Sequence, residues 1–236
     1  MKTAYLALAL LAATPALAQN EEIIVTGSRR AGSLQAQEVQ LPAITLRRAA
    51  DFLVQPVRIS GDTRDPDKRK AEIYAMLAAA VALAEKRGAS IQLGTGSSRL
   101  TIIDKGNYRS LPVSDDDDRD DTGEVSFLIK TPLANAADFA AAEARIAAFI
   151  KSVPANGRAE LEATGDPSLS VVNPSQYRAA IIDLITADAK ATAARMGPDY
   201  GAYLQGLDRQ VQWGPGAPGE VALFLPYVYQ ISPRPR

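Results

Sequence analysis

The chain has 236 residues, 47% of them hydrophobic, which is enough to bury the core of one domain or of two small ones. It contains neither cysteine nor histidine, which excludes disulfides, cysteine nucleophiles, serine–histidine triads and histidine–zinc sites. The formal net charge of −1 lacks the basic excess typical of nucleic-acid-binding proteins, so we expect no nucleic-acid partner.

The first eighteen residues have the features of a secretory signal peptide. Lys2 precedes an apolar run over residues 4–13, and Ala16 and Ala18 place small side chains where signal peptidase cleaves. The run is too short to span a bilayer of roughly 30 Å. We therefore expect a mature chain that begins at Gln19 and lies in the periplasm or at the outer membrane, with no transmembrane segment after cleavage.

Residues 19–49 form an N-terminal segment ahead of the main domain. Its apolar block, Ile23 to Val25, is short and is followed by a polar linker over residues 28–40. The block predicts one short extended strand, either in this protein's own sheet or added to the sheet edge of a partner, with a disordered tail as the further alternative. Another short strand is expected over residues 41–46.

The stretch 51–88 predicts a strand, a capped turn and a long helix. Apolar residues alternate over residues 53–59, which is the pattern of a strand with one buried face. Asp65 directly precedes Pro66, a pair typical of a helix start, because the carboxylate caps backbone N–H groups and proline suits the first turn. Gly88 predicts the helix end. A helix of this length needs a sheet of several strands to cover its apolar side.

The next segments predict a hairpin and an acidic loop. Strands over residues 90–93 and 99–104 flank the glycine-rich turn 94–98, which lacks the lysine and the helix of a phosphate-binding loop. The run Asp115 to Asp121 holds six aspartates, whose oxygens suit calcium. If Asp118 is the first position of a calcium-binding loop, however, the twelfth position is Ile129 and not the required glutamate. We therefore predict a solvated loop, with calcium binding as the alternative.

The second half of the chain contains a second helix-start signal. Asn173 precedes Pro174 as Asp65 precedes Pro66, which predicts another capped helix, running to Met196. The remaining expected elements are strands over residues 124–131, 158–163, 169–172, 203–213 and 220–231, and an alanine-rich helix over residues 136–150.

The order of these elements indicates an α+β fold, in which mixed, largely antiparallel sheets pack against about three long helices. Strand, helix and hairpin occur in this order twice, so we expect two similar halves. The main domain is expected to span residues 50–232, followed by a frayed tail over residues 233–236.

Four stretches carry a resemblance to a known family. They are the strand start Ala50-Asp51, the helix end Lys86 to Ala89, the segment Leu169 to Arg178 and the final strand Val221 to Ile231. From about residue 51 onward the chain resembles the SIMPL-domain family of exported bacterial proteins, although Ala50 stands where the family has proline. The resemblance implies an envelope protein without catalytic residues that self-associates, some members forming ring-like oligomers.

Residues 22–29 resemble the TonB box that opens the TonB-dependent receptors of alphaproteobacteria. A receptor barrel of 22 strands, at roughly ten residues each, would take up essentially the whole chain, and the predicted helices are incompatible with it. The resemblance implies an extended segment that docks onto TonB or another envelope protein. The implied contact residues are Ile23, Ile24, Val25, Thr26 and Gly27.

These observations suggest three functions. The first is a non-enzymatic protein of the cell envelope that is structural or binds partners, including copies of itself. The second is a TonB-linked accessory of outer-membrane transport that docks through Ile23 to Thr26 without a receptor barrel. The third is a carboxylate-based hydrolase that uses Asp62 or Asp65 beside Asp67, but helix capping explains Asp65 and Asp67 without catalysis. We favour the first, and predict no catalytic, cofactor-binding or metal-binding residue.

Overall fold

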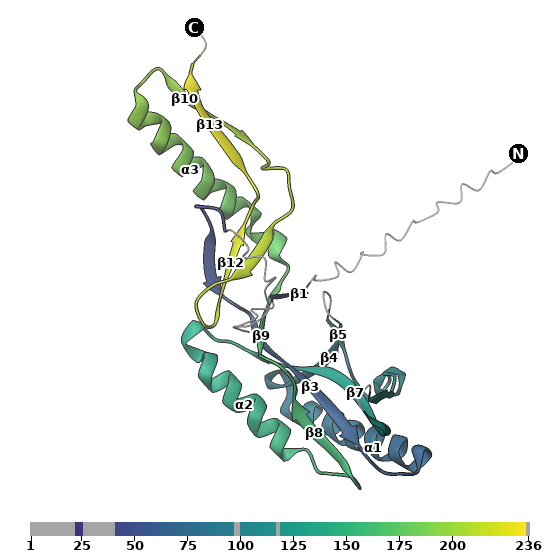
Figure 1. Ribbon diagram of the computed structural model, residues 1–236. Coiled ribbons are helices and arrows are strands. Elements are labelled where there is room, and N and C mark those ends of the chain that lie inside the picture. Colours follow the sequence, from purple (N-terminus) through teal and green to yellow (C-terminus); the bar gives the residue numbers. More distant parts are fainter. Residues whose placement is uncertain (1–21, 26–40, 97–99, 117–118, 235–236) are drawn as a thin grey trace, which may run out of the picture.

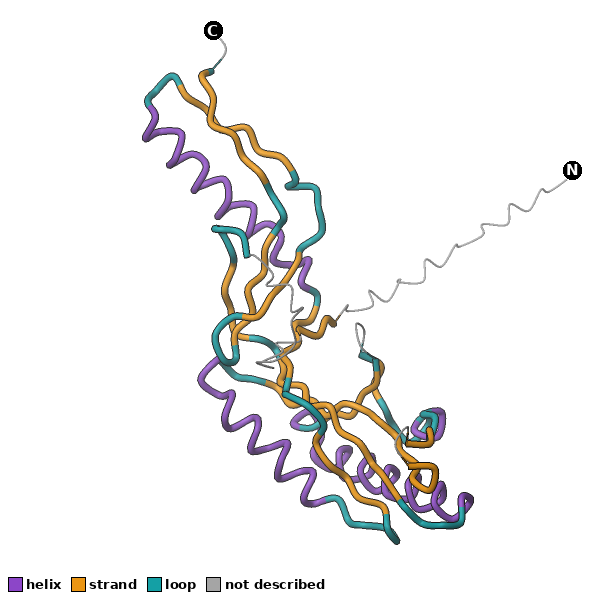
Figure 2. The backbone as a smooth tube through the Cα atoms, in the orientation of Figure 1, coloured by secondary structure: helices purple, strands orange, loops and turns teal. Residues whose placement is uncertain are grey.

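A computed structural model describes residues 22–25, 41–96, 100–116 and 119–234 of the chain. It shows an elongated molecule in which helices lie against antiparallel sheets (Figure 1, Figure 2), so the predicted α+β class is confirmed. No helix within these ranges combines the length and the apolar character that crossing a lipid bilayer requires. The long helices of the described residues are α1 (Pro66–Arg87), α2 (Phe139–Ser152) and α3 (Arg178–Met196).

The strands of the same ranges are numbered in chain order. They are β1 (Glu22–Val25), β2 (Leu46–Ala49), β3 (Phe52–Gly61), β4 (Gln92–Thr95), β5 (Thr101–Ile102), β6 (Ser114–Asp116), β7 (Arg119–Pro132), β8 (Ala159–Ala163), β9 (Ser168–Val172), β10 (Tyr200–Gln205), β11 (Gln212–Pro215), β12 (Glu220–Phe224) and β13 (Val228–Pro233). Short 3₁₀ turns are η1 (Gly88–Ser90), η2 (Tyr108–Ser110), η3 (Ala136–Asp138) and η4 (Pro174–Tyr177).

The largest sheet, with α1 and α2, forms one end of the molecule, which we call the body. Its strands follow the order β1-β9-β3-β7-β4-β5, with β6 beside β7 and β8 beside β3, and all these pairings are antiparallel. β8 and β9 are successive stretches along β3, separated by a turn at Gly165, whose φ is 68°. Together β3, α1, β4, β7, α2 and β8 have the β-α-β-β-α-β arrangement of ferredoxin-like folds.

Both helices of the body cover the same face of this sheet. A β-carbon at Gly61 of β3 would lie 3.4 Å from Ile73 of α1. Thr131, the cross-strand neighbour of Leu53, accepts a hydrogen bond at 3.1 Å from the Arg145 Nε of α2. Odd-numbered residues of β3 and β7 therefore face the helices and form the core. Its fully buried side chains include Leu53, Ile59, Ile73, Leu77, Ile129 and Phe149.

The other end of the molecule is an arm made of α3, β10 and β13 (Figure 1). β10 and β13 pair with each other in a two-stranded ribbon, and α3 packs on one face of it. β11 and β12 continue the two strands toward the body, where β2 pairs with β12 to complete a three-stranded sheet. The arm is thus one helix on two strands, and it extends away from the body.

The long strands predicted over residues 203–213 and 220–231 are each divided in two, so this part of the prediction is wrong. The breaks lie between β10 and β11 and between β12 and β13. At the first break Gly206 has a φ of 83°, and a β-carbon there would lie 2.5 Å from the carbonyl oxygen of Pro226 at the second break. Since proline has no N–H to donate and glycine alone fits this approach, strand pairing stops here on both sides.

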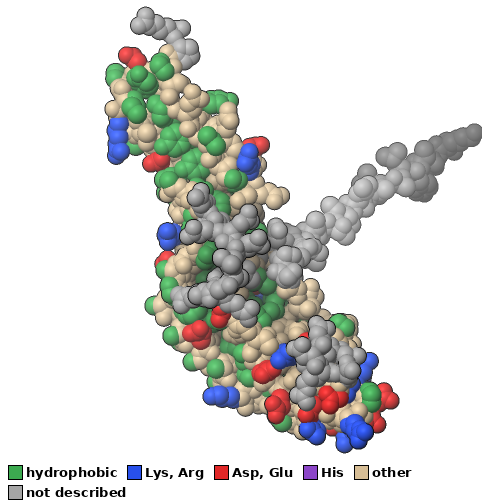
Figure 3. Space-filling model, viewed as in Figure 1, with side chains coloured by type: hydrophobic (Ala, Val, Ile, Leu, Met, Phe, Trp, Pro, Cys, Tyr) green, Lys and Arg blue, Asp and Glu red, His purple; other side chains and the backbone are tan. Residues whose placement is uncertain are grey.

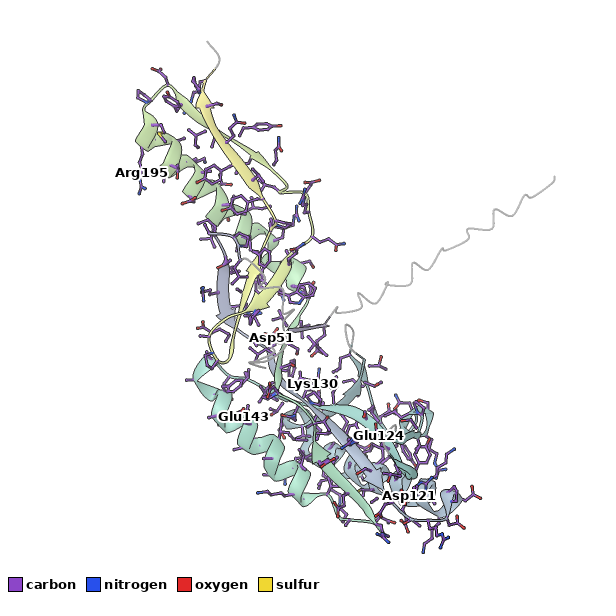
Figure 4. The ribbon with its side chains drawn as sticks, in the orientation of Figure 1. Asp51, Asp121, Glu124, Lys130, Glu143 and Arg195 are labelled. Carbon is purple, nitrogen blue, oxygen red and sulfur yellow. The ribbon has the colours of Figure 1, made fainter. Side chains whose placement is uncertain are left out.

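Asp51 joins the body to the arm (Figure 4). It lies between β2 and β3, and its carboxylate accepts a hydrogen bond from the Val172 backbone N–H at 2.9 Å. It also forms an ion pair with Arg48 at 2.8 Å, and the Arg48 guanidinium lies 4.4 Å from the centre of the Tyr177 ring. One hydrophobic cluster includes residues of both ends. Asp51 therefore ties the end of β9 and the start of β3 to the segment that leads into α3.

One of the two predicted helix caps is confirmed and the other is wrong. The Asp65 side chain accepts a hydrogen bond from the Lys68 backbone N–H at 2.9 Å, and α1 begins at the next residue, as expected. Asn173 instead has a left-handed backbone, with a φ of 48°, and its side-chain oxygen accepts a hydrogen bond from the Ser175 hydroxyl at 2.6 Å. The turn η4 separates Asn173 from α3, so its side chain cannot reach the free N–H groups of that helix.

The acidic run is part of a hairpin and not a loop. Residues 114–116 form β6, which pairs with β7 from residue 119 onward, and residues 117–118 lie outside the described ranges. Asp115 pairs with Gly123 and Asp116 with Arg119, so the described part of the run lies on strands. The prediction of a solvated loop is therefore wrong for the described part of Asp115 to Asp121.

The repeated succession of strand and helix lies within the body, as β3-α1-β4 and β7-α2-β8, and the arm differs from it. The body has two helices on an eight-stranded sheet, whereas the arm has one helix on a two-stranded ribbon. The folded part also begins before residue 50, because β1 and β2 belong to sheets. At the other end β13 extends through Pro233, and the backbone N–H of Arg234 donates a hydrogen bond to the Asp199 carbonyl at 2.7 Å. The described part of the expected tail is therefore ordered by strand pairing.

Candidate functional site

The N-terminal strand is the first candidate site. β1 contains Ile23, Ile24 and Val25 and pairs with β9, while Thr26 and Gly27 lie outside the described residues. β1 is the outermost strand of the body sheet, so among the described residues strand pairing occupies only one of its two edges. For this segment the structure thus has a strand in the protein's own sheet, and docking onto a partner stays a prediction.

A buried ion pair fastens β1 to the sheet. Lys130 of β7 (Figure 4) is 4% exposed. Its ammonium group lies 2.6 Å from the carboxylate of Glu22, the first residue of β1. Glu22 also accepts a hydrogen bond from the Ser170 hydroxyl at 2.7 Å, and the Lys130 Nζ lies 4.2 Å from the centre of the Phe52 ring. A buried charge is costly without a partner, so Glu22 holds the N-terminal strand in place by covering Lys130.

A second polar site lies where α1 meets β8. The Glu72 side chain is buried and accepts hydrogen bonds from the Thr63 hydroxyl and from the Arg158 backbone N–H, the latter at 3.2 Å. The Thr63 hydroxyl first, and then the Arg158 N–H, hold the pKa of Glu72 below its ordinary value. Gly157, with a φ of 59°, leaves room for the Glu72 carboxylate, because a β-carbon at residue 157 would lie 2.2 Å from the Glu72 carboxyl carbon. Glu72 is therefore a fixed, ionised acceptor rather than a proton donor near neutral pH.

The three carboxylates considered for a hydrolase have separate local roles. Asp62 forms an ion pair with Arg158, with 2.6 Å between the carboxylate and Nε, and both side chains line a polar cleft at the end of β3. Asp65 caps α1. Asp67 lies along a different groove, between α1 and η2. The structure thus does not bring these residues into one site as a carboxylate pair.

Sequence reasoning did not single out Glu72. It lies one helical turn before Met76, and both are buried on the side of α1 that faces the sheet. The signal was therefore present, as a charged residue on the apolar stripe of a helix, because such a residue needs a partner from another element.

The face of the body sheet opposite the helices carries a charged ladder. Arg58 of β3 lies between Glu124 of β7, at 2.9 Å, and Glu162 of β8, at 2.6 Å. Hydrogen bonds to Glu162 and then to Glu124 raise the pKa of Arg58. All three side chains are partly exposed, so we expect the ladder to keep this face polar and to add little stability.

The calcium alternative for the acidic run stays a prediction. Within the described ranges no three or more acidic side chains are grouped as a metal site would require. The side chains of residues 115–120 are outside the description, so this statement does not extend to them.

Exposed hydrophobic side chains gather on the arm. Figure 3 shows hydrophobic atoms over much of the arm, whereas acidic and basic side chains gather at the far end of the body. On the outward face of the ribbon Tyr203 is 63% exposed and Val228 is 68% exposed. Of the six large hydrophobic side chains exposed among the described residues, five belong to the arm: Leu184, Met196, Tyr200, Tyr203 and Val228. Such a concentration is typical of surfaces that contact other proteins.

Comparison with protein-family models and with curated proteins finds no match to this chain. The resemblances to the SIMPL domain and to the TonB box therefore remain predictions from the sequence.

Proposed function

We propose that this chain is a non-enzymatic, exported protein of the cell envelope, of the SIMPL type, that acts by contact with other proteins or with copies of itself. The observation that carries the proposal is the arm, which extends from the body and presents five of the six large hydrophobic side chains that are exposed among the described residues. An exposed apolar surface on a thin projection has no role in stabilising the fold, so its burial against a partner is the physical gain.

The chemistry of the carboxylates supports a role without catalysis. Asp62 and Glu72 are engaged by Arg158, and Asp65 caps a helix. A lowered pKa at Glu72 is the opposite of what a general acid working near neutral pH needs. Asp62, Asp65 and Glu72 thus each have a structural partner that accounts for them.

Fractionation of cells that produce the full chain tests the proposal. We expect recovery in the periplasmic fraction without detergent, an intact mass that begins at Gln19, and crosslinked species in cells treated with a membrane-permeant reagent. A protein that is found in the cytoplasmic fraction and still carries residues 1–18 would contradict the proposal. A mature protein that forms no crosslinked species at all would also contradict it.

A second candidate function is a TonB-linked accessory of outer-membrane transport. It is favoured by one observation, which is that β1, with Ile23 to Val25, is an outermost strand with an unpaired edge. An extended partner strand could add to that edge. Capture of TonB by a peptide covering residues 21–30, but not by a scrambled peptide of the same composition, is the expected result; equal capture by both would refute this candidate.

A further inference from the structure

The free edge of β10 can be located residue by residue. The Arg234 N–H bonds the Asp199 carbonyl, and residues 199 and 234 continue the register of the ribbon. In an antiparallel pair, hydrogen-bonded and non-hydrogen-bonded positions alternate. Residues 201, 203 and 205 therefore bond to β13, whereas residues 200, 202 and 204 direct their N–H and C=O groups to the opposite edge.

At that edge only the first of the three residues has its backbone groups satisfied. The Tyr200 N–H bonds the Gly197 carbonyl at 3.2 Å. The Tyr200 carbonyl accepts a hydrogen bond at 3.1 Å from the Arg234 side chain, which crosses the ribbon over Gly201. Ala202 and Leu204 have no such partners among the described residues. Four backbone groups, two N–H and two C=O, therefore line the open edge of β10.

β10 is also the one edge strand of the described ranges that lacks ordinary protection. Proteins guard open edges with charged side chains, with proline or by keeping the strand very short. The other edge strands β1, β2, β6 and β8 carry charged residues, β11 and β13 contain proline, and β5 has two residues. β10, with the sequence YGAYLQ, has six residues and neither charge nor proline. Such a strand is a template for pairing with another chain.

We propose that β10 pairs antiparallel with β10 of a second copy of this chain, about a twofold axis at Tyr203. The inference deepens the proposed function, on which it rests, by naming the partner and the contact. The ribbons of two copies would form a four-stranded sheet in the order β13-β10-β10-β13, with both α3 helices on the same face because a twofold axis perpendicular to a sheet preserves its faces.

The spacing of the open groups suits pairing with a second copy. Ala202 and Leu204 are separated by one residue, so a twofold at Tyr203 sets Ala202 of each copy opposite Leu204 of the other. Both are outward-directed positions, and the pairing uses all four open groups of each chain. No charged side chain lies in β10, so like charges do not meet across the axis. The contact is isologous and closes on itself, as in most homodimers.

The same register covers an exposed aromatic side chain. Tyr203 of one copy lies opposite Tyr203 of the other in a non-hydrogen-bonded pair, where α-carbons are about 4.5 Å apart. The two rings, each 63% exposed in the single chain, would cover each other. Val228 lies on the same outward face but on β13, where it pairs with Gln205. Two Val228 residues would therefore be three strand spacings, about 14 Å, apart across the sheet and four residues, about 13 Å, apart along it.

Single cysteine variants test this geometry directly, because the chain has no cysteine of its own. Disulfides require α-carbons within about 7 Å. Tyr203→Cys is expected to form a disulfide-linked dimer of the purified full-length protein under mild oxidation, whereas Val228→Cys, at a position of similar exposure on the same face, is expected to stay unlinked. Equal crosslinking of both variants, or crosslinking of Val228→Cys alone, would overturn the proposed register.

Charge variants test the association in solution. Sedimentation equilibrium of the unmodified protein should give twice the mass of one chain. Tyr203→Lys should give a single-chain mass, because it sets two ammonium groups face to face, and Val228→Lys should remain dimeric, with circular dichroism showing that both variants are folded. A single-chain mass for the unmodified protein, or a Tyr203→Lys variant that is still a dimer, would overturn the proposal. A Tyr203→Cys variant that crosslinks in cells only to a different polypeptide would overturn it as well.

These outcomes are separable from those of the proposed function. A single-chain mass in a protein recovered from the periplasm refutes the β10 contact and leaves the envelope role standing. A β10-linked dimer that stays in the cytoplasm refutes the envelope role and leaves the contact standing.

Discussion

Replacing Glu22 with glutamine should destabilise the whole protein, although Glu22 is the first described residue of the chain. Glutamine keeps the size of the side chain but removes its charge, which leaves the Lys130 ammonium group buried without a counter-charge. Lys130 is 4% exposed, and its ammonium group forms an ion pair with Glu22 and lies 4.2 Å from the centre of the Phe52 ring. Removing one member of a buried ion pair typically costs about 3–5 kcal/mol.

The expected loss is at the lower end of that range, about 3 kcal/mol, because the four-residue strand β1 can detach and let water reach Lys130. The cost is thus limited by the free energy that holds β1 on the sheet. For a chain of this size each kcal/mol corresponds to roughly 2–4 °C in Tm, so Glu22→Gln should lower Tm by about 6–12 °C.

Thermal and urea unfolding measure this effect on four proteins: the unmodified protein, Glu22→Gln, the double variant Glu22→Gln with Lys130→Met, and Glu160→Gln. Lys130→Met combined with Glu22→Gln should unfold within about 1 kcal/mol of the unmodified protein, because an uncharged pair carries no burial cost for charge. Glu160→Gln, at an exposed glutamate of β8, is the matched control and should shift stability by no more than about 0.5 kcal/mol. If Glu22→Gln melts with the control, then Glu22 does not hold β1 on the sheet, and the view of this segment as a docking strand gains support.

Changes at four further positions test other contacts. In urea unfolding, Asp65→Ala should lower the free energy of unfolding by about 1 kcal/mol through loss of a helix cap. Asn173 has a left-handed backbone, so Asn173→Ala should cost about 1 kcal/mol and Asn173→Gly almost nothing. Equal effects of the two Asn173 variants would contradict the backbone explanation. Asp51→Ala removes the acceptor of the Val172 N–H and the ion-pair partner of Arg48 at the junction. It should cost about 2 kcal/mol and increase proteolysis between the body and the arm, and unchanged proteolysis would argue against a joining role. Because the pKa of Glu72 in the folded protein is lowered from about 4.5, its ionised form stabilises the fold above that pH, and the contribution is lost as the pH falls through the lower folded value. Glu72→Gln should therefore flatten the fall in Tm below about pH 4.5, and an unaltered slope would contradict this assignment.

The sequence predicted the elements whose signals are local. The start of α1 was readable because Asp65 and Pro66 are adjacent, and its end because Gly88 follows the last turn. The same local rule failed at Asn173, since the sequence pattern does not reveal a left-handed backbone. Likewise, the break in the strand at Gly206 depends on Pro226, twenty positions away, which comes close only when the hairpin forms.

The polar sites were less predictable because their members come from distant parts of the chain. Lys130 alternates with apolar residues and looks like a solvent-facing strand position, yet β1 and Phe52 cover it. Its partner Glu22 is 108 positions earlier in the chain. Glu72 had a signal in the helix period, but its two donors lie on a preceding loop and at the start of β8, and Gly157 gave no sign of its role.

The pairing of β1 with β9 also bears on the order in which the protein folds. Glu22 and Ser170 meet across 148 positions of the chain, so this is among the most non-local contacts of the fold. Such contacts form late, because a large loop must close before they contribute any stability. A chain that emerges N-terminus first exposes Ile23 to Val25 long before β9 is available. During that interval the first strand has no intramolecular partner, and any envelope protein that recognises it would compete with the chain's own β9 for the same backbone groups.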